Sequence, residues 1–379
     1  METGVKELIE KLSKERTLSR EEFTELFRIY GVLGSGESRR EPSRSVNLCP
    51  GLPDALCTEE EAILFEKARE VREKYYGRDV YLRGLIEFTN YCRNDCYYCG
   101  IRRSNKNTSR YRLSRERILE CCEEGYALGF RTFVLQGGED MAYSDDAICE
   151  IVSGIKERYA DCAVTLSIGE RERASYQAYF DAGADRYLLR QETSDPDHYR
   201  LLHPAGLSIG NRKRCLSDLK EIGYQVGCGI MIGTPGQTPD HIILDLQYMK
   251  ELGPHMIGIG PFIPHRDTPF KDCSAGSMRD TLILLAVIRL MNPQVLLPAT
   301  TALGTIHPFG REMGILAGAN VIMPNLSPGD VRGKYLLYDG KICTGDEAAE
   351  CRRCMELRID RTGYRVVMSR GDCAGFVKK

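Results

Sequence analysis

Residues 82–100 read LRGLIEFTNYCRNDCYYCG, an apolar run followed by three cysteines within eight residues. The apolar run predicts a strand, so Cys92, Cys96 and Cys99 lie on the loop that leaves it. Thiolates are soft ligands that suit iron–sulfur clusters or zinc, and both usually take four protein ligands. No fourth cysteine follows at comparable spacing, so a cluster held here keeps one iron open for another ligand. The alternatives are a zinc loop or three buried cysteines.

Short β-branched runs recur between segments of helical periodicity, which is typical of a parallel α/β fold. The candidate strands are residues 85–88, 132–135, 163–167, 186–189, 226–231, 256–259, 295–297 and 320–323. Their spacing leaves room for one helix between successive strands, and Ser114 and Thr238 are suited to cap two of these helices. We predict a complete (β/α)8 TIM-type barrel, whose chemistry lies at the carboxyl ends of the strands.

The remaining chain differs in character from this alternating region. Residues 1–80 are charged and helical in pattern and predict an N-terminal helical extension. Residues 81–325 form the predicted barrel. Residues 326–379 predict an irregular C-terminal tail that carries a second cysteine group. These three ranges are the predicted domains.

Charge and composition limit which binding partners and which cellular compartment we expect for this protein. The 52 basic and 54 acidic residues nearly cancel, so no broad field favours nucleic acid or an anionic membrane surface. The charged N-terminal segment lacks a signal-peptide core, and no apolar run reaches membrane-spanning length. Sixteen cysteines suit a reducing compartment. We therefore expect a cytoplasmic protein.

Polar residues and glycines follow several predicted strands, where a barrel would gather them around one cavity. Gly138 lies in a Gly-Gly-Glu run after the second strand, Ser167 ends the third, and Glu192 follows the fourth. The Glu192 carboxylate can accept hydrogen bonds from an ammonium group or from ribose hydroxyls; the alternative is an acid at a helix N-terminus. Thr300 and Thr301 follow the seventh strand and are candidate ligand contacts or helix caps.

Arg212 lies early in a predicted helix. Its guanidinium is suited to a paired contact with a carboxylate, and the alternative is a solvated surface arginine.

The spacing C-x3-C-x2-C, with an aromatic residue before the last cysteine, resembles the signature of radical S-adenosylmethionine (SAM) enzymes, and the Gly-Gly-Glu run resembles their SAM-contacting motif. From about residue 83 to residue 354 the chain further resembles the HydE family, the maturases of [FeFe]-hydrogenase. The matching runs are residues 86–92, 98–103, 105–107, 164–167, 183–190, 261–265 and 298–302.

This resemblance implies that Cys92, Cys96 and Cys99 hold a [4Fe-4S] cluster whose open iron binds SAM. By position, the SAM contacts would be Gly138, Ser167, Glu192 and Arg212. The deeper cavity, which takes anions and sulfur-containing amino-acid-like compounds in the family, would be lined by Arg83, Arg186, Thr300, Thr301, Met323 and Tyr335.

The family also implies a reaction and partners. SAM cleavage yields a 5′-deoxyadenosyl radical, which processes an iron carbonyl–cyanide–cysteine precursor supplied by HydG during assembly of the hydrogenase H-cluster. HydF is the expected acceptor of the product, and an external donor supplies the electron. Neither nucleic acid nor a membrane is an expected partner.

The second cysteine group is Cys343, Cys351 and Cys354. It resembles the peripheral ligands of a second cluster, [2Fe-2S] or [4Fe-4S], in some HydE proteins. Three thiolates without an evident fourth can equally bind zinc or stay reduced, and Cys373 would be a fourth ligand if the tail folds back.

Two other functional interpretations stay open at this point. One is a related radical SAM enzyme, such as a methylornithine synthase or a biotin-synthase-like enzyme. The other is a noncatalytic iron–sulfur scaffold, which would transfer clusters without forming 5′-deoxyadenosine.

Overall fold

The computed structural model describes residues 4–34, 45–52, 56–345 and 348–377. Its centre is a six-stranded parallel sheet in the order β10-β8-β7-β6-β5-β4. These strands are β4 (Gly84–Thr89), β5 (Thr132–Gly137), β6 (Ala163–Ser167), β7 (Arg186–Leu188), β8 (Gln225–Cys228) and β10 (Met256–Ile257). Helices follow the strands in alternation, as parallel connections require, so the α/β prediction is confirmed.

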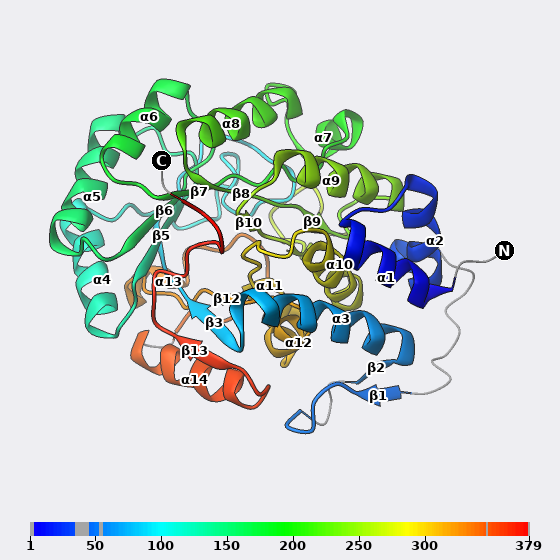
Figure 1. The fold of residues 1–379 in the computed structure, drawn as a ribbon. Helices are drawn as coiled ribbons and strands as arrows, with labels where there is room; N and C mark the ends of the chain where they lie inside the picture. Colours follow the sequence, from blue (N-terminus) through cyan, green and yellow to red (C-terminus); the bar gives the residue numbers. More distant parts are fainter. Residues whose placement is uncertain (1–3, 35–44, 53–55, 346–347, 378–379) are drawn as a thin grey trace.

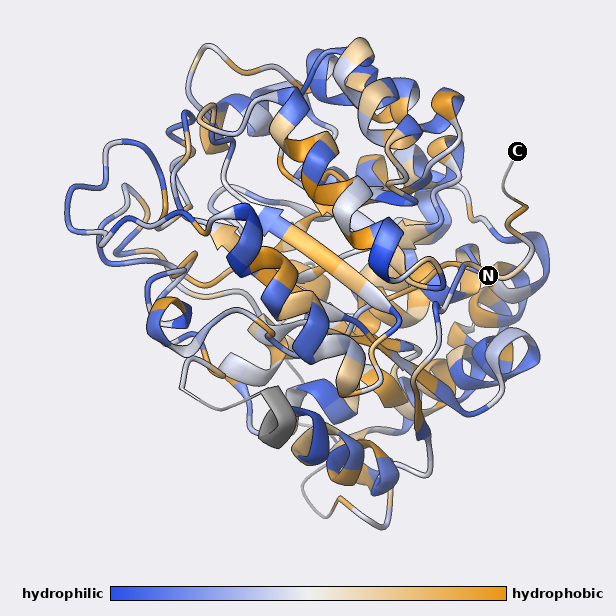
Figure 2. Ribbon diagram, turned by 90° about the vertical axis from the view of Figure 1, so that its left-hand side faces the viewer, coloured by the Kyte–Doolittle hydropathy of each residue, from blue (hydrophilic) through white to orange (hydrophobic). Residues whose placement is uncertain are grey.

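The connecting helices form an outer layer around the strands (Figure 1). They are α4 (Arg115–Ala127), α5 (Asp145–Arg158), α6 (Arg173–Asp181), α7 (Pro196–Leu202), α8 (Ile209–Ile222), α9 (Pro239–Leu252), α10 (Met278–Met291), α11 (Thr301–Ile306) and α12 (Gly310–Leu316). Ser114 and Thr238 cap α4 and α9 as expected, because their side chains accept from the backbone N–H groups of Arg117 and His241. Figure 2 shows apolar residues gathered along the central strands, where burial supplies most of the stability.

Two predicted strands are interrupted in the structure. The segment 226–231 divides into β8 and β9 (Met231–Ile232); the segment 256–259 forms β10 only over Met256–Ile257, and a separate strand, β11 (Gly260–Pro261), follows it. The interruption lies at Gly229, where an added Cβ would overlap the carbonyl oxygen of Gly258. Only glycine allows this close backbone approach.

The seventh predicted strand, 295–297, forms isolated bridges rather than a ladder. Leu296 bridges Met256 in β10, and Pro298 bridges Val321 in β12 (Val321–Ile322). Pro298 lacks a backbone N–H, which shortens the pairing. β12 in turn pairs in parallel with β3 (Asp79–Leu82). The structure therefore establishes the six-stranded parallel sheet and these separate pairings.

The terminal regions are more regular than the sequence indicates. The N-terminal region contains α1 (Val5–Glu15), α2 (Arg20–Tyr30), a 3-10 turn (Val32–Gly34) and α3 (Glu59–Tyr76), and also the antiparallel pair β1 (Ser45–Asn47) and β2 (Leu56–Thr58). The expectation of an irregular tail is wrong: it contains α13 (Gly329–Arg332), α14 (Ala348–Asp360) and β13 (Arg365–Val367). β13 pairs in parallel with β3. This pairing holds the tail against β3.

Helix α10 lies between the sheet and the N-terminal helices, and all of its residues from Asp280 to Met291 are buried. None of the helices in the described part of the chain is long and apolar enough to cross a bilayer.

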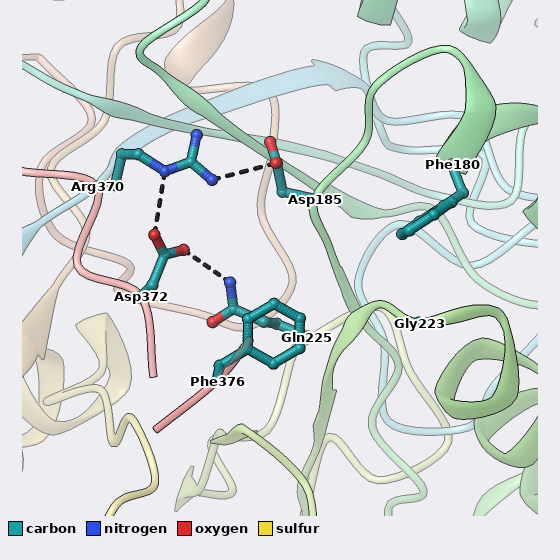
Figure 3. Close-up of a pocket in the computed structure, with 7 residues that line it drawn as sticks. All are labelled: Phe180, Asp185, Gly223, Gln225, Arg370, Asp372 and Phe376. Atoms are coloured by element: carbon teal, nitrogen blue, oxygen red, sulfur yellow. Dashed lines mark hydrogen bonds and ion pairs between the residues drawn. The ribbon is translucent and has the colours of Figure 1, made fainter. Parts of the chain in front are cut away.

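The end of the tail closes over the amino ends of the central strands. Asp372 accepts from Arg186 Nη2 and from Gln225 Nε2, both at 2.7 Å, at the first residues of β7 and β8. Arg370 donates to Asp372 at 3.0 Å and to Asp185 at 3.1 Å, as Figure 3 shows. Asp185, Gln225, Arg370 and Asp372 line a cavity of about 130 Å³ together with Phe180, Gly223 and Phe376. This cavity lies at the amino ends of the strands, whereas the cysteine loop lies at their carboxyl ends.

We expect Asp372→Asn to destabilise the fold by roughly 1–3 kcal/mol, because it leaves the buried Arg186 guanidinium without its carboxylate. Burial alone would raise the pKa of Asp372, but Arg186, Gln225 and Arg370 hold it below its ordinary value. The carboxylate therefore adds stability above a pH of about 4, and this contribution is lost as the pH falls further.

Chemical denaturation at about pH 7 and at about pH 3.5 measures this difference. Asp330→Asn is the matched control, because Asp330 forms an exposed ion pair with Arg117 at 2.9 Å; its loss should cost less than about 0.5 kcal/mol. Equal effects of the two substitutions would contradict the role given to Asp372.

Candidate metal and cofactor site

The three cysteines of the first group follow β4 at the carboxyl end of the sheet, and all three are partly buried. Distant segments hold their loop: Arg93 N donates to Glu139 O at 2.9 Å, Tyr97 N to Leu202 O at 3.0 Å, and Gly100 N to Leu337 O at 2.8 Å. The loop is therefore fixed by the strand exits around it.

Burial raises the pKa of the thiols of Cys92 and Cys96, and it raises that of Cys99 to about 12. The negative charges of the three sulfurs also act on one another, since Cys92 and Cys99 raise the pKa of Cys96. Thiolates gathered in this way need a nearby positive charge, which a metal centre supplies.

The Gly-Gly-Glu run packs directly against the cysteine loop. An added Cβ at Gly138 would lie 2.7 Å from the Cys92 Cβ and would overlap the carbonyl oxygen of Tyr91. Glu139 accepts from Arg93 Nε at 2.9 Å and from the Glu170 N–H at 3.0 Å. The run therefore joins the exits of β5 and β6 to the loop.

Arg212 is buried, so the surface-arginine alternative is wrong. Its Nε donates to Glu170 Oε1 at 2.5 Å and its Nη1 donates to the Arg190 carbonyl at 2.7 Å. The Arg212 charge opposes the rise in the pKa of Cys96 that burial causes. A fixed guanidinium therefore lies close to the cysteine group.

Glu192 adopts a left-handed backbone conformation with φ of 66° and is only 7% exposed. It is not the acid that begins α7, because Asp195 caps that helix. Its Oε2 lies 3.2 Å from Arg190 Nη2 but has no hydrogen-bond partner among the described residues. Burial raises the pKa of Glu192, while Arg190 and Arg212 oppose that rise.

These observations fit the implied cofactors. Three thiols on one loop are suited to holding an iron–sulfur cluster. The orphaned Glu192 oxygen is suited to the ammonium or hydroxyl groups of SAM, and Ser167 lies at the same edge, paired with Gln136 in the β5–β6 ladder. Within the described residues, no three His, Cys, Asp or Glu side chains converge as ligands of a single metal ion.

Four of the predicted cavity residues lie near the carboxyl end of the strands. Thr300 occupies the N-cap position of α11, but its hydroxyl does not cap the helix and has no partner in the described part of the chain. Thr301 and Met323 line a small cavity of about 20 Å³. The Tyr335 hydroxyl accepts from Gln136 Nε2 at 3.4 Å.

The other two predicted cavity residues face the tail. Arg83 Nη2 donates to the Gly371 carbonyl at 3.3 Å, and Arg186 Nη2 donates to the Arg370 carbonyl at 2.6 Å. Both arginines are buried, and burial lowers the pKa of each. The structure therefore brings them together with the end of the chain rather than with the cysteine loop.

The second cysteine group lies beside α12. Arg311 Nη1 and Nη2 each lie 3.7 Å from the Cys343 Sγ, and the negative charges of Cys343 and Cys354 both raise the pKa of Arg358. Cys351 has its backbone in α14, but its side chain lies outside the described part of the chain.

Cys373 does not join the second group, contrary to the possibility raised by the sequence. Its Sγ donates to the Gln294 carbonyl at 3.0 Å, and its N–H donates to Gln225 Oε1 at 2.9 Å. Because β13 pairs with β3, the tail runs toward the amino ends of the strands, and Cys373 lies there instead.

Sequence reasoning did not assign two buried ion pairs. One is the Glu170–Arg212 pair, and the other joins Lys341 Nζ to Glu87 Oε1 at 2.6 Å. Asn325 and the Tyr335 carbonyl complete the second pair with bonds of 2.9 and 2.8 Å. The available signal was a charged residue inside an apolar strand, as Glu87 is, or in the loop that follows one, as Glu170 is.

Comparison with known proteins agrees with this geometry. Residues 86–268 match the family described as the Radical SAM superfamily. Over 330 residues, the chain is 46% identical to the [FeFe] hydrogenase maturase subunit HydE of Thermotoga maritima, covering 86% of this chain and 92% of that protein. It is also 34% identical to the 3-methylornithine synthase of Methanosarcina barkeri over 267 residues, covering 70% of this chain and 75% of that protein.

A solved structure is also similar. The crystal structure of methylornithine synthase (PylB) superposes with a TM-score of 0.76 at 27% identity, covering 95% of this chain and 97% of that one.

We expect Gly138→Ala to lower the iron bound after anaerobic reconstitution, because the new methyl group displaces the backbone around Cys92 at an overpacking cost of about 1–3 kcal/mol. The matched control is Gly333→Ala, where an added Cβ meets nothing within 4 Å. Iron analysis of both folded proteins measures the effect. Full iron loading of Gly138→Ala would show that the contact does not shape the cysteine loop.

Proposed function

This chain belongs to the family of the [FeFe] hydrogenase maturase subunit HydE, within the radical SAM superfamily, and on that premise we propose that it cleaves SAM reductively to process an organometallic precursor of the hydrogenase H-cluster. It is therefore a radical SAM enzyme whose cofactors are a [4Fe-4S] cluster and SAM. When bound, these cofactors supply the 5′-deoxyadenosyl radical. The protein's own part is to bind, orient and enclose.

One observation carries the proposal: the three-cysteine loop and the orphaned Glu192 oxygen lie at the same edge of the sheet. Cys92, Cys96 and Cys99 would hold the cluster and leave one iron for SAM. Glu192 would accept hydrogen bonds from SAM, and Arg212, fixed by Glu170 at 2.5 Å, would pair with its carboxylate.

Gly138 and Ser167 complete the proposed SAM contacts. Gly138 allows the close approach of the backbone to the loop, and Ser167 offers a hydroxyl from the end of β6. The buried position of Glu192 and Arg212 supports water exclusion from the reacting centre.

The substrate would occupy the interior beyond SAM. Thr300, Thr301, Met323 and Tyr335 support this placement, because they lie near the carboxyl ends of the strands and the Thr300 hydroxyl is buried without a partner among the described residues. Arg83 would contribute positive charge from the far end, beside Arg186, whose charge Asp372 compensates. The proposed substrate is an iron carbonyl–cyanide–cysteine complex from HydG, the proposed acceptor is HydF, and an external donor would supply the electron.

We also infer that the strands close into a (β/α)8 barrel. Support comes from the bridges Met256–Leu296 and Pro298–Val321 and from the β12–β3 pairing, which link β10, at the edge of the six-stranded sheet, back toward β4.

The ranges 1–80, 81–325 and 326–379 stay predictions for the domains. The cytoplasmic location also stays a prediction.

The principal alternative is a methylornithine-synthase-like activity, which the similarity to that enzyme in sequence and fold favours. The higher identity to HydE over more of the chain supports the maturase.

We expect anaerobically reconstituted protein to form 5′-deoxyadenosine from SAM in the presence of a strong reductant, and Cys96→Ala to reduce this by at least about a hundredfold, because the cluster loses one of its three ligands. Cys121→Ala is the control, since Cys121 is buried in α4 away from the loop. Chromatography of the product measures the rate. Addition of the HydG product should increase turnover, and ornithine-type amino acids should not. The opposite preference would favour the synthase.

We expect the combined replacement of Cys343, Cys351 and Cys354 by alanine to lower bound iron while SAM cleavage continues, because Cys343 contacts Arg311 and Cys354 acts on Arg358, neither of which is a proposed SAM contact. Iron analysis and the 5′-deoxyadenosine assay on the same preparation test both parts. Loss of cleavage in a folded variant would show that the second group is required for catalysis.

A further inference from the structure

We propose that Asp245, on helix α9, is a positioning residue that holds the loop 190–194 so that Glu192 faces SAM. The inference rests on the proposed role of Glu192 as a SAM contact. Asp245 itself is fully buried and lies behind the loop, on the outer layer of helices.

The loop needs such support because its backbone is strained. Glu192 is one of four described non-glycine residues with positive φ, a conformation that side chains other than glycine adopt only when the surroundings enforce it. On the inner side, Glu192 N donates to Gly229 O at 3.0 Å and Gln191 Oε1 accepts from Gly229 N at 2.8 Å. These bonds hold one side of the loop to β8.

On the outer side, the Asp245 carboxylate faces complementary groups of the same loop. The N–H and hydroxyl of Ser194 and the side-chain amide of Gln191 act on the carboxylate. Both Asp245 oxygens, Ser194 Oγ and Gln191 Nε2 are buried atoms that lack a hydrogen bond of normal geometry within the described structure. Donors and acceptors that face one another in this way pair after small side-chain rotations.

The charged and titratable groups around Asp245 come from the loop 190–194 and from the elements packed against it. Lys213 of α8 is the facing cation, and its Nζ donates to the Ser194 carbonyl at 3.5 Å. Cys228 of β8 is a titratable neighbour, and the loop itself carries Arg190 and Glu192. Burial raises the pKa of Asp245 to about 7.

The buried carboxylate therefore works against folding. For an acid with a raised pKa, stability falls as the pH rises from the ordinary value toward 7, because the folded state disfavours the charged form. A neutral side chain would serve the packing at least as well. A costly carboxylate behind a strained loop of the site points to a role in function.

The test compares Asp245→Asn with Asp240→Asn in the reconstituted holoenzyme. Asp240 lies on the same helix with its side chain 60% exposed, in an ion pair with Arg20. At about pH 8 we expect Asp245→Asn to weaken SAM binding by roughly tenfold, measured by equilibrium dialysis, with unchanged iron content and an unchanged or higher melting temperature. Asp240→Asn should bind SAM as the unmodified protein does.

The pH profile provides a second readout that a purely structural residue would not change. SAM affinity of the unmodified protein should fall as the pH drops through about 7, and this step should disappear in Asp245→Asn. Asp245→Leu removes every polar atom from the side chain and should also weaken SAM binding in a folded protein.

Glu192→Gln distinguishes a failure of the positioning role of Asp245 from a failure of the proposed SAM contact. If it weakens SAM binding while both folded Asp245 variants bind normally, the positioning role is overturned and the proposed function stands. If Glu192→Gln also binds normally, the proposed SAM contact itself fails. Failure of both Asp245 variants to fold would likewise overturn the positioning role, because Asp245 would then be a determinant of folding.

Discussion

The close contact between Gly138 and the cysteine loop is the constraint on which the rest of the site depends. Because position 138 carries no side chain, the exit of β5 can approach Tyr91 and Cys92 directly. Glu139 then ties the loop to Arg93 and to the exit of β6. The loop is thereby held in one conformation by the sheet, which is how a rigid scaffold presents a metal site.

Buried charges divide the molecule into two functional ends. At the carboxyl ends of the strands, Glu170 fixes Arg212, Lys341 fixes Glu87, and one oxygen of Glu192 has no hydrogen-bond partner among the described residues. At the amino ends, the tail carboxylate of Asp372 compensates Arg186, which is fully buried. A buried ion pair contributes little net stability, but the loss of one partner is costly. These pairs therefore serve mainly to fix geometry, at the site and at the closure of the opposite end.

Local signals account for what could be predicted. The helix caps at Ser114 and Thr238, the position of the cysteine loop and every predicted strand run except 295–297 follow from short-range chemistry, and the structure contains them. The divided strands at Gly229 and the ordered tail were not foreseen, because each depends on a partner distant in the chain: Gly258 in the first case and β3 in the second. Cys373 was misplaced for the same reason.

Local sequence specifies the class of chemistry, since three thiols at fixed spacing after a strand leave few alternatives to a cluster with an open iron. The charges that face that loop depend on the folded chain. Glu170 fixes the orientation of Arg212, and Asp245 faces Ser194 and Gln191 in the loop that carries Glu192, although neither relation is visible in local spacing. The physical reason is that a ligand's chemical type is carried by the side chain itself, whereas its orientation, burial and charge environment depend on strands and helices that meet only in the folded chain.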